Sequence, residues 1–239
     1  MFDRLKKSLS KDAPPPVLTG TPRVHDEMVA WGLAQGLNDA APKDGKGFAM
    51  TGTTSSRPWT LECGRSSRDY IRGDELRAKA DLKVNDDAVV LIMNRPLKNA
   101  LETRAYEMYT DTLQTTADPS LPEEMRWLAM YPEADWPSMP RPFWNRYVAL
   151  SDQLEHAVAW IDEDLMGQLV SWPAPAPDDQ VPFILMLLRG KAYLRMQYTP
   201  GDLVTLAHAA KIFTKACSSA VSGLAAEPRN KVQTSRQIQ

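Results

Sequence analysis

Several segments of the chain alternate between apolar and polar residues with a period of two. Trp59, Leu61 and Cys63 alternate with polar neighbours, which is typical of a half-buried strand. Residues 76–82 alternate as strictly, although their residue types favour helix. The period predicts a strand there, because packing commonly overrides intrinsic propensity. The continuous apolar run of residues 88–93 predicts a central strand.

Other segments repeat their apolar residues every three or four positions, which predicts amphipathic helices. One begins at Thr21-Pro22, where threonine can cap the helix and proline suits its first turn. A second begins at Pro96. A third is predicted from a buried stripe made of Leu154, Val158, Ile161, Leu165 and Leu169.

The last helix is predicted from about residue 202 to residue 224, and it carries the most regular stripe. Before it, residues 181–188 and 192–198 predict a hairpin that turns at Arg189-Gly190. Sequential elements usually pack together, so this hairpin should cover the stripe. Leu206 and Phe213 are therefore expected among the most buried residues.

Two further strands are predicted at Arg126–Tyr131 and Phe143–Leu150, on either side of a proline-broken stretch. Two strand-to-helix junctions resemble each other and lie 57 residues apart. Met93-Asn94 ends one strand and Leu150-Ser151 ends the other, and each precedes an amphipathic helix. The same offset aligns Trp127–Tyr131 with Ile184–Leu188. One interpretation is an internal duplication; the other is that strand-to-helix junctions generally look alike.

The fold class predicted from these elements is α+β. An antiparallel sheet would be covered by three or four amphipathic helices within one domain of residues 21–224, with related halves at 48–116 and 126–224 in the case of duplication. Residues 1–20 predict a flexible basic tail with a proline-rich linker, and residues 225–239 a disordered polar tail.

Charge is distributed unevenly along the chain. Residues 1–23 carry five basic and two acidic groups, and residues 227–239 carry three and one. Since the whole chain has a net charge of −2, the body between these ends has −7. An acidic body repels phosphate backbones, so nucleic acid is not an expected partner. Two cysteines, and no apolar segment of signal or membrane-spanning length, predict a cytoplasmic protein.

No short catalytic or cofactor motif is complete in this sequence. Residues 47–54 space two glycines as a phosphate-binding loop does, but Thr53 stands where the lysine should be, so a strand end is the preferred interpretation. His156 and His208 lie two residues from stripe positions and are expected in solvent, and His25 falls in the first turn of a helix. No histidines share metal-ligand spacing, so neither metal nor cofactor is predicted.

The cysteines and acidic runs give no catalytic assignment either. Cys63 and Cys217 lie on apolar faces, which predicts buried free thiols rather than nucleophiles. No serine lies in a nucleophile-elbow sequence. The acidic pairs and runs are interpreted as solvated faces or helix starts.

Two features suggest contact surfaces. Five tryptophans fall between residues 127 and 172, and Trp136, Met139 and Trp144 are candidate contacts for a partner protein, although core packing is the simpler interpretation. Near the N-terminus, a short basic amphipathic segment could touch an anionic membrane through Phe2, Leu5, Lys6, Lys7 and Leu9.

The function predicted from the sequence is therefore a non-catalytic cytoplasmic interaction or adaptor protein, whose partner is another protein. One alternative is a hydrolase whose site is assembled from carboxylates and arginines that no short motif reveals. Another is a peripheral membrane protein attached through the N-terminal segment.

Overall fold

The structure is a computed structural model, and it describes residues 22–42, 47–111 and 123–225. The segment expected to contact a membrane, which includes Phe2, Leu5 and Leu9, lies outside these residues. Across the described ranges, no helix combines the length and the apolar character needed to cross a bilayer.

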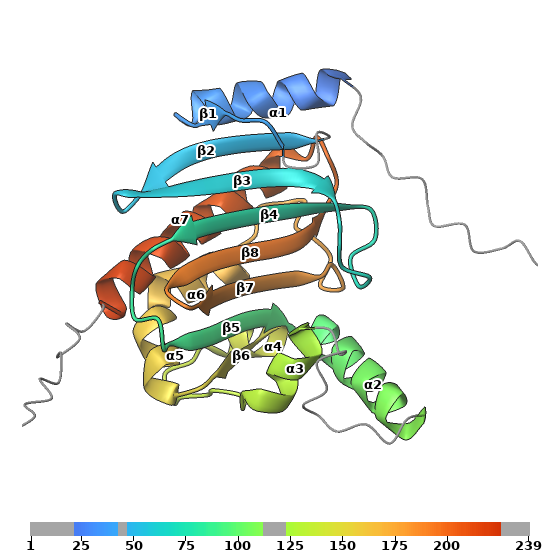
Figure 1. Cartoon of the computed structure of the whole chain (residues 1–239), viewed down its shortest axis with the longest axis vertical. Helices are drawn as coiled ribbons and strands as arrows, with labels where there is room; N and C mark the ends of the chain where they lie inside the picture. Colours follow the sequence, from blue (N-terminus) through green and yellow to red (C-terminus); the bar gives the residue numbers. More distant parts are fainter. Residues whose placement is uncertain (1–21, 43–46, 112–122, 226–239) are drawn as a thin grey trace, which may run out of the picture.

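An antiparallel sheet of eight strands forms the centre of the structure (Figure 1). The spatial order of its strands is β1-β2-β3-β4-β8-β7-β5-β6. In chain order they are β1 (Asn38–Asp39), β2 (Phe48–Thr54), β3 (Arg57–Arg65), β4 (Asp74–Asp81), β5 (Val89–Asn94), β6 (Tyr147–Ser151), β7 (Phe183–Leu188) and β8 (Lys191–Tyr198). The hairpin β7–β8 therefore separates the strands that come before it into two groups.

The predicted hairpin is confirmed, with β7 and β8 joined by the two residues Arg189 and Gly190. Both residues have positive φ, of 52° and 68°, as the favoured two-residue hairpin turn requires. A Cβ at Gly190 would also lie 3.0 Å from the carbonyl oxygen of Val84. Glycine at this position thus satisfies both the turn and the close approach of the neighbouring backbone.

Seven helices are described around the sheet, which confirms the α+β class and adds short helices that the sequence did not predict. They are α1 (Pro22–Ala34), α2 (Arg95–Asp111), α3 (Glu123–Met130), α4 (Arg141–Arg146), α5 (Leu154–Trp160), α6 (Glu163–Val170) and α7 (Leu203–Gly223). Figure 1 shows α7 crossing behind the sheet and α3 in front of β5 and β6.

The main core lies between the sheet and α7, with contributions from α1, α4, α5 and α6. Leu206 and Phe213 are both completely buried in it, as the stripe of the last helix predicted. The indole of Trp160 on α5 donates a hydrogen bond to the carbonyl of Ala216 on α7 over 2.9 Å. The apolar face of α7 is thus covered within the chain.

A second core lies on the opposite face of the sheet, where α2 and α3 pack on β5, β6 and β7. Leu97 and Leu101 come from α2, and Met125 and Trp127 come from α3. This core includes no described residue of β3 or β4 and only Tyr193 from β8, so the face is apolar and covered at one end and polar at the other.

Two of the predicted strands are wrong. Residues 126–130 belong to helix α3, whose first turn carries Glu123 and Glu124, and acidic side chains favour a helix start. In the segment 143–150, only residues from Tyr147 onward form a strand, because α4 occupies the preceding residues and buries Phe143 in the main core. Pro142 suits the first turn of α4.

The predicted stripe from Leu154 to Leu169 is also wrong as one helix. The chain breaks at Ile161, and Asp162 begins α6 by accepting a hydrogen bond from the Leu165 amide over 2.8 Å. Leu154 and Val158 are 45% and 47% exposed. The hydrogen bond that caps the new helix at Asp162 thus stabilises the chain more than one continuous apolar stripe would.

The internal resemblance agrees with the structure at two of its three places. Strands β5 and β6 both run directly toward helices, α2 and α5 respectively. The alignment of Trp127–Tyr131 with Ile184–Leu188 is wrong, because the first segment belongs largely to α3 and the second to β7. The division into halves stays a prediction.

Candidate functional site

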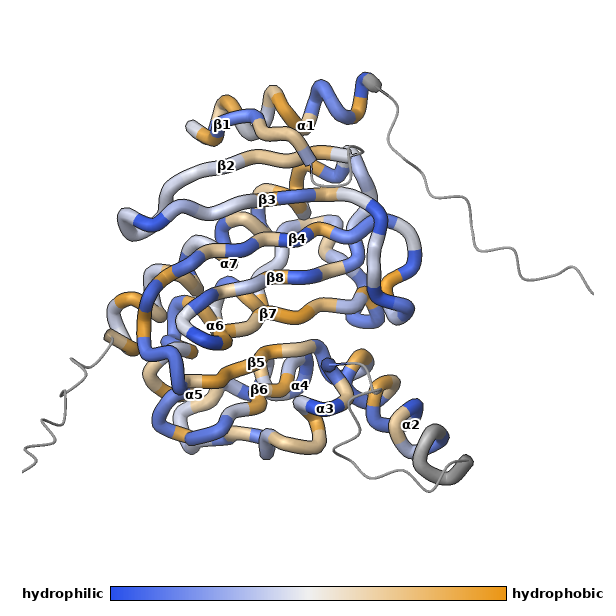
Figure 2. Tube along the Cα trace, in the orientation of Figure 1, coloured by the Kyte–Doolittle hydropathy of each residue, from blue (hydrophilic) through white to orange (hydrophobic). Residues whose placement is uncertain are grey.

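The open end of the second sheet face carries an unusual set of side chains. Where α2 and α3 cover the face, β5, β6 and β7 present only apolar residues. Figure 2 shows this change from hydrophobic β5 and β7 to β4 and β8, which carry hydrophilic positions. The open strands present Thr60, Glu62, Arg77, Lys79, Tyr193 and Arg195.

The register of the strands places these residues in rows. Glu62 on β3 is paired with Arg77 on β4, and Arg77 is paired with Arg195 on β8. In the next row, Lys79 on β4 is paired with Tyr193 on β8. Two arginines directly opposite each other repel. This arrangement therefore calls for anionic groups close by.

Two buried carboxylates supply part of that negative charge from within. Glu75 and Glu124 are 0% and 1% exposed. Arg195 Nε lies 2.7 Å from Glu75 Oε1, and Arg68 Nε lies 2.7 Å from Glu124 Oε1. These ion pairs hold the two guanidinium groups at the edge of the sheet face.

Neutral donors complete the network around the buried carboxylates. Ser66 Oγ donates to Glu75 Oε2 over 3.3 Å, and the Tyr70 hydroxyl donates to Glu124 Oε1 over 3.0 Å. Burial raises the pKa of the Tyr70 hydroxyl, and the charge of Glu124 raises it further. Tyr70 therefore stays a neutral hydrogen-bond donor at every ordinary pH.

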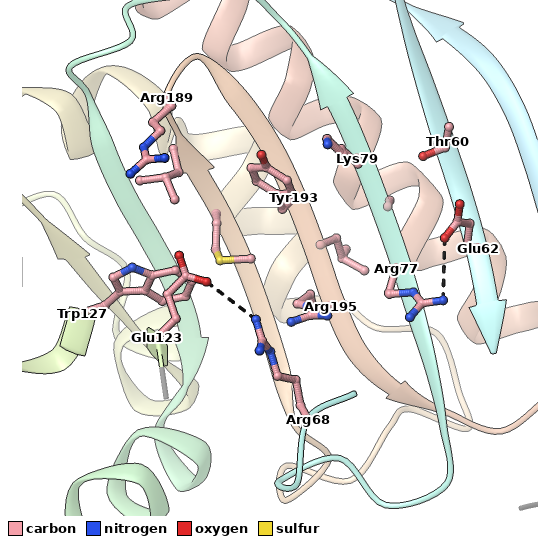
Figure 3. Close-up of a pocket in the computed structure, with 14 residues that line it drawn as sticks. Thr60, Glu62, Arg68, Arg77, Lys79, Glu123, Trp127, Arg189, Tyr193 and Arg195 are labelled. Carbon is pink, nitrogen blue, oxygen red and sulfur yellow. Dashed lines mark ion pairs between the residues drawn. The ribbon is translucent and has the colours of Figure 1, made fainter. Parts of the chain in front are cut away.

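Above this network lies a hollow of about 440 Å³, which we call the arginine hollow (Figure 3). Strands β3, β4, β7 and β8 form its floor, and α3 forms one wall with Glu123 and Trp127. Five of the lining side chains are cationic and two are acidic; the cationic ones are Arg68, Arg77, Lys79, Arg189 and Arg195. Guanidinium groups bind carboxylates and phosphates through paired hydrogen bonds, so the hollow suits an anionic group.

The lining does not contain the usual parts of a hydrolytic site. None of the residues that line the arginine hollow is a histidine, cysteine or serine. Its two acidic residues both lie near arginines: Glu62 is 3.7 Å from Arg77, and Glu123 is 3.7 Å from Arg68.

The residues predicted as partner contacts lie elsewhere. Trp136 and Met139 are partly buried and pack against the main core. Trp144 on α4 is also partly buried, and the guanidinium of Arg95 lies over its ring at 4.3 Å from the centroid. The structure does not bring these three residues to the arginine hollow, and their contact with a partner stays a prediction.

His156, which was expected in solvent, is partly buried. Its Nδ1 lies 3.0 Å from Asp152 Oδ1, and the neighbouring Ser151 hydroxyl lies 2.7 Å from the Gln153 carbonyl and 2.9 Å from the Val89 carbonyl. The serine therefore faces backbone carbonyls instead of a histidine nitrogen, and the three residues fix a turn rather than form a catalytic triad.

His208 was also expected in solvent, but it packs against Trp172. Its ring lies 4.7 Å from that of Trp172, and its Nε2 donates to the Gln168 carbonyl over 2.8 Å. Burial lowers the pKa of His208 from its ordinary value of 6.5, and the charge of Lys211 lowers it further. His208 also borders a groove of about 780 Å³ on the α7 face, lined by Trp31, Leu37, Trp59 and other residues.

The lowered pKa of His208 predicts a pH dependence of stability. The folded chain binds this proton less readily than the unfolded chain, so stability is lost as the pH falls below about 6.5. We expect the melting temperature of the wild type to fall by about 2–4 °C more than that of His208→Gln between pH 7 and pH 5. Glutamine can donate the same hydrogen bond without titrating. Equal losses in thermal scans of the two proteins would contradict the assignment.

The two cysteines are buried and free, as predicted. Burial raises the pKa of each thiol to about 12, so neither is a thiolate at neutral pH. The residues described here contain no group of three histidine, cysteine or acidic side chains suited to hold a metal ion. Gly52, from the loop-like motif at residues 47–54, lies inside strand β2.

One pattern in the sequence does indicate the arginine hollow. Arg77 and Lys79, like Tyr193 and Arg195, occupy the positions of their strands that alternate with buried residues, and three of these four are cationic. That parity predicts a cationic sheet face. Arg68 and Glu124 carried no such signal, because Arg68 comes from a loop and Glu124 lies in the first turn of α3, before the segment 126–131 that was predicted as a strand.

Comparison with known proteins concerns the fold. No protein-family model matches the chain, and no curated protein does. A crystal structure of the mycobacterial trehalose monomycolate transport factor A is similar, with a TM-score of 0.50 and 9% sequence identity over 87% of this chain and 100% of that chain. At this identity the likeness shows a shared fold alone.

Proposed function

We propose that this chain is a non-catalytic binding protein, and that its arginine hollow receives an acidic segment of a partner protein. The observation that carries the proposal is the gathering of five cationic side chains over one hollow of about 440 Å³. Four carboxylates lie beside them, so the hollow keeps an excess of one positive charge; they belong to Glu62, Glu75, Glu123 and Glu124. Buried Glu75 and Glu124 hold two of the cationic side chains in place from behind. A preorganised cationic surface lowers the cost of binding an anionic partner.

The spread of the charges favours a segment over a single small anion. Arg189 lies in the turn of the β7–β8 hairpin and Arg195 lies six residues further along, which corresponds to at most roughly 20 Å along the strand direction. One carboxylate or phosphate can bridge only neighbouring cations. A chain with several carboxylates can reach them all.

Two further points support a non-catalytic role. The side chains that line the hollow lack a nucleophile with an adjacent base. The protein of similar fold is named a transport factor, which describes no chemical reaction. The proposal assigns the interaction to the open sheet face, while contact of a partner with the tryptophan-rich stretch stays a separate prediction.

The test is calorimetric titration of the full chain with an acetylated and amidated hexa-aspartate at low salt. The variant Lys79→Gln/Arg189→Asn removes two exposed cations from the hollow, and asparagine tolerates the positive φ of residue 189. We expect the dissociation constant to rise about tenfold, or about 1.4 kcal/mol for the two charges together.

The matched control is Arg141→Gln/Lys211→Gln, which removes two exposed cations from α4 and α7. It should change the dissociation constant by less than about twofold, since it alters only the long-range field. No measurable binding by the wild type at low salt, or equal weakening in both variants, would overturn the proposal.

A further inference from the structure

The two sides of the arginine hollow are chemically unlike. On one side, β4 and β8 present Arg77, Lys79 and Arg195. On the other side, the lining comes from the edge of the second core and includes Trp127, Met186 and Leu188. Figure 3 shows Trp127 across the hollow from Lys79 and Arg77. The border between them runs along β7 and β8, where the cover provided by α3 ends.

The two sides share one spacing. Arg77 and Lys79 are two residues apart on β4, as are Tyr193 and Arg195 on β8 and Met186 and Leu188 on β7. A two-residue step in a strand is about 6.6 Å. A ligand that matches both sides must therefore repeat its charged groups and its apolar groups at this same interval.

An extended peptide has this repeat. Its successive side chains point in opposite directions, and side chains on one side recur every two residues. Laid along the border, such a peptide turns one set of side chains toward the cations and the other set toward the apolar edge. A helix repeats its faces every three or four residues, or about 4.5–6 Å, so it falls out of step with the 6.6 Å interval as it lengthens.

We propose that the docked segment is extended and alternates acidic with apolar residues. This inference rests on the proposed function and deepens it, because it names the sequence pattern that the hollow recognises. The acidic side chains contact Arg77, Lys79 and Arg195, and the apolar side chains contact Leu188 and the part of Trp127 that lines the hollow.

The decisive comparison uses two peptides of equal composition and charge, acetyl-Asp-Leu-Asp-Leu-Asp-Leu-amide and acetyl-Asp-Asp-Asp-Leu-Leu-Leu-amide. Only the first places acidic and apolar side chains on opposite sides of an extended chain. We expect it to bind the wild type about tenfold more tightly, as measured by calorimetry. Equal affinity of the two peptides would overturn the inference.

A variant on the apolar side of the hollow provides a second test of the alternating pattern. Leu188→Thr should weaken binding of the alternating peptide about threefold to fivefold and leave hexa-aspartate binding unchanged. Leu37→Thr, at a half-buried leucine in the groove on the opposite face, is the matched control and should change neither. Should Leu188→Thr fail to fold, Leu188→Ala makes the same test, because it removes apolar contact area from the same partly buried position without adding a hydroxyl group.

The failure of this inference can be told apart from that of the proposed function. If hexa-aspartate binds and responds to Lys79→Gln/Arg189→Asn but the two mixed peptides bind alike, the hollow recognises charge alone and the alternating pattern is wrong. If hexa-aspartate does not bind in the hollow, the proposed function itself is wrong.

Discussion

Replacing Phe213 by alanine should lower the free energy of unfolding by about 3–5 kcal/mol. Phe213 lies on α7, is 0% exposed, and packs against the ring of Trp59 on β3 with centroids 5.5 Å apart. Alanine would leave a cavity between the helix and the sheet, where the surrounding residues can collapse only in part. Since a domain is commonly stable by 5–15 kcal/mol, this loss is a large share of the total.

The measurement is urea denaturation of Phe213→Ala beside the wild type. Val204→Ala, on the same helix but 44% exposed, is the control and should cost less than about 1 kcal/mol. Similar losses for the two variants would contradict the packing of α7. A midpoint that depends on protein concentration in the wild type alone would instead indicate that the stripe of α7 contacts a second subunit.

The second large effect is expected from Arg195→Met, which should destabilise the fold by about 3 kcal/mol. Arg195 Nε lies 2.7 Å from Glu75, and that carboxylate is completely buried. After the substitution, Glu75 keeps the Ser66 hydroxyl at 3.3 Å and Arg77 at 3.8 Å. A buried carboxylate without its close partner is costly, because it has lost both water and the nearest compensating charge.

A double-mutant cycle isolates the ion pair from the packing. Glu75→Leu/Arg195→Met removes both charges and should recover about 2 kcal/mol relative to Arg195→Met alone. Lys79→Met changes an exposed cation on the same sheet face and should cost less than about 0.5 kcal/mol. If the double variant is no more stable than Arg195→Met, the pair does not hold the network together. Arg195→Met should also lose binding of hexa-aspartate, which ties the buried network to the proposed site.

Local pattern determined much of the secondary structure. The strict alternation in residues 76–82 overcame their helical composition, and the turn at Arg189-Gly190 defined a hairpin that the structure confirms. The regular stripe of the last helix placed Leu206 and Phe213 in the core. These features depend on residues that lie close together in the chain, so a single sequence contains the information needed to predict them.

Only the tertiary structure decided how the elements combine and where the site lies. Residues 126–130 belong to helix α3, which covers β5 and β7 in the second core. This packing joins distant segments, so the local alternation of residues did not show it. The arginine hollow joins Arg68 from a loop, Glu124 from α3 and Arg195 from β8, which are separated by 56 to 127 residues. Along the sequence each of these looks like a solvated charge. Their common role appears only when the fold removes water from the carboxylates and leaves the arginines facing one hollow.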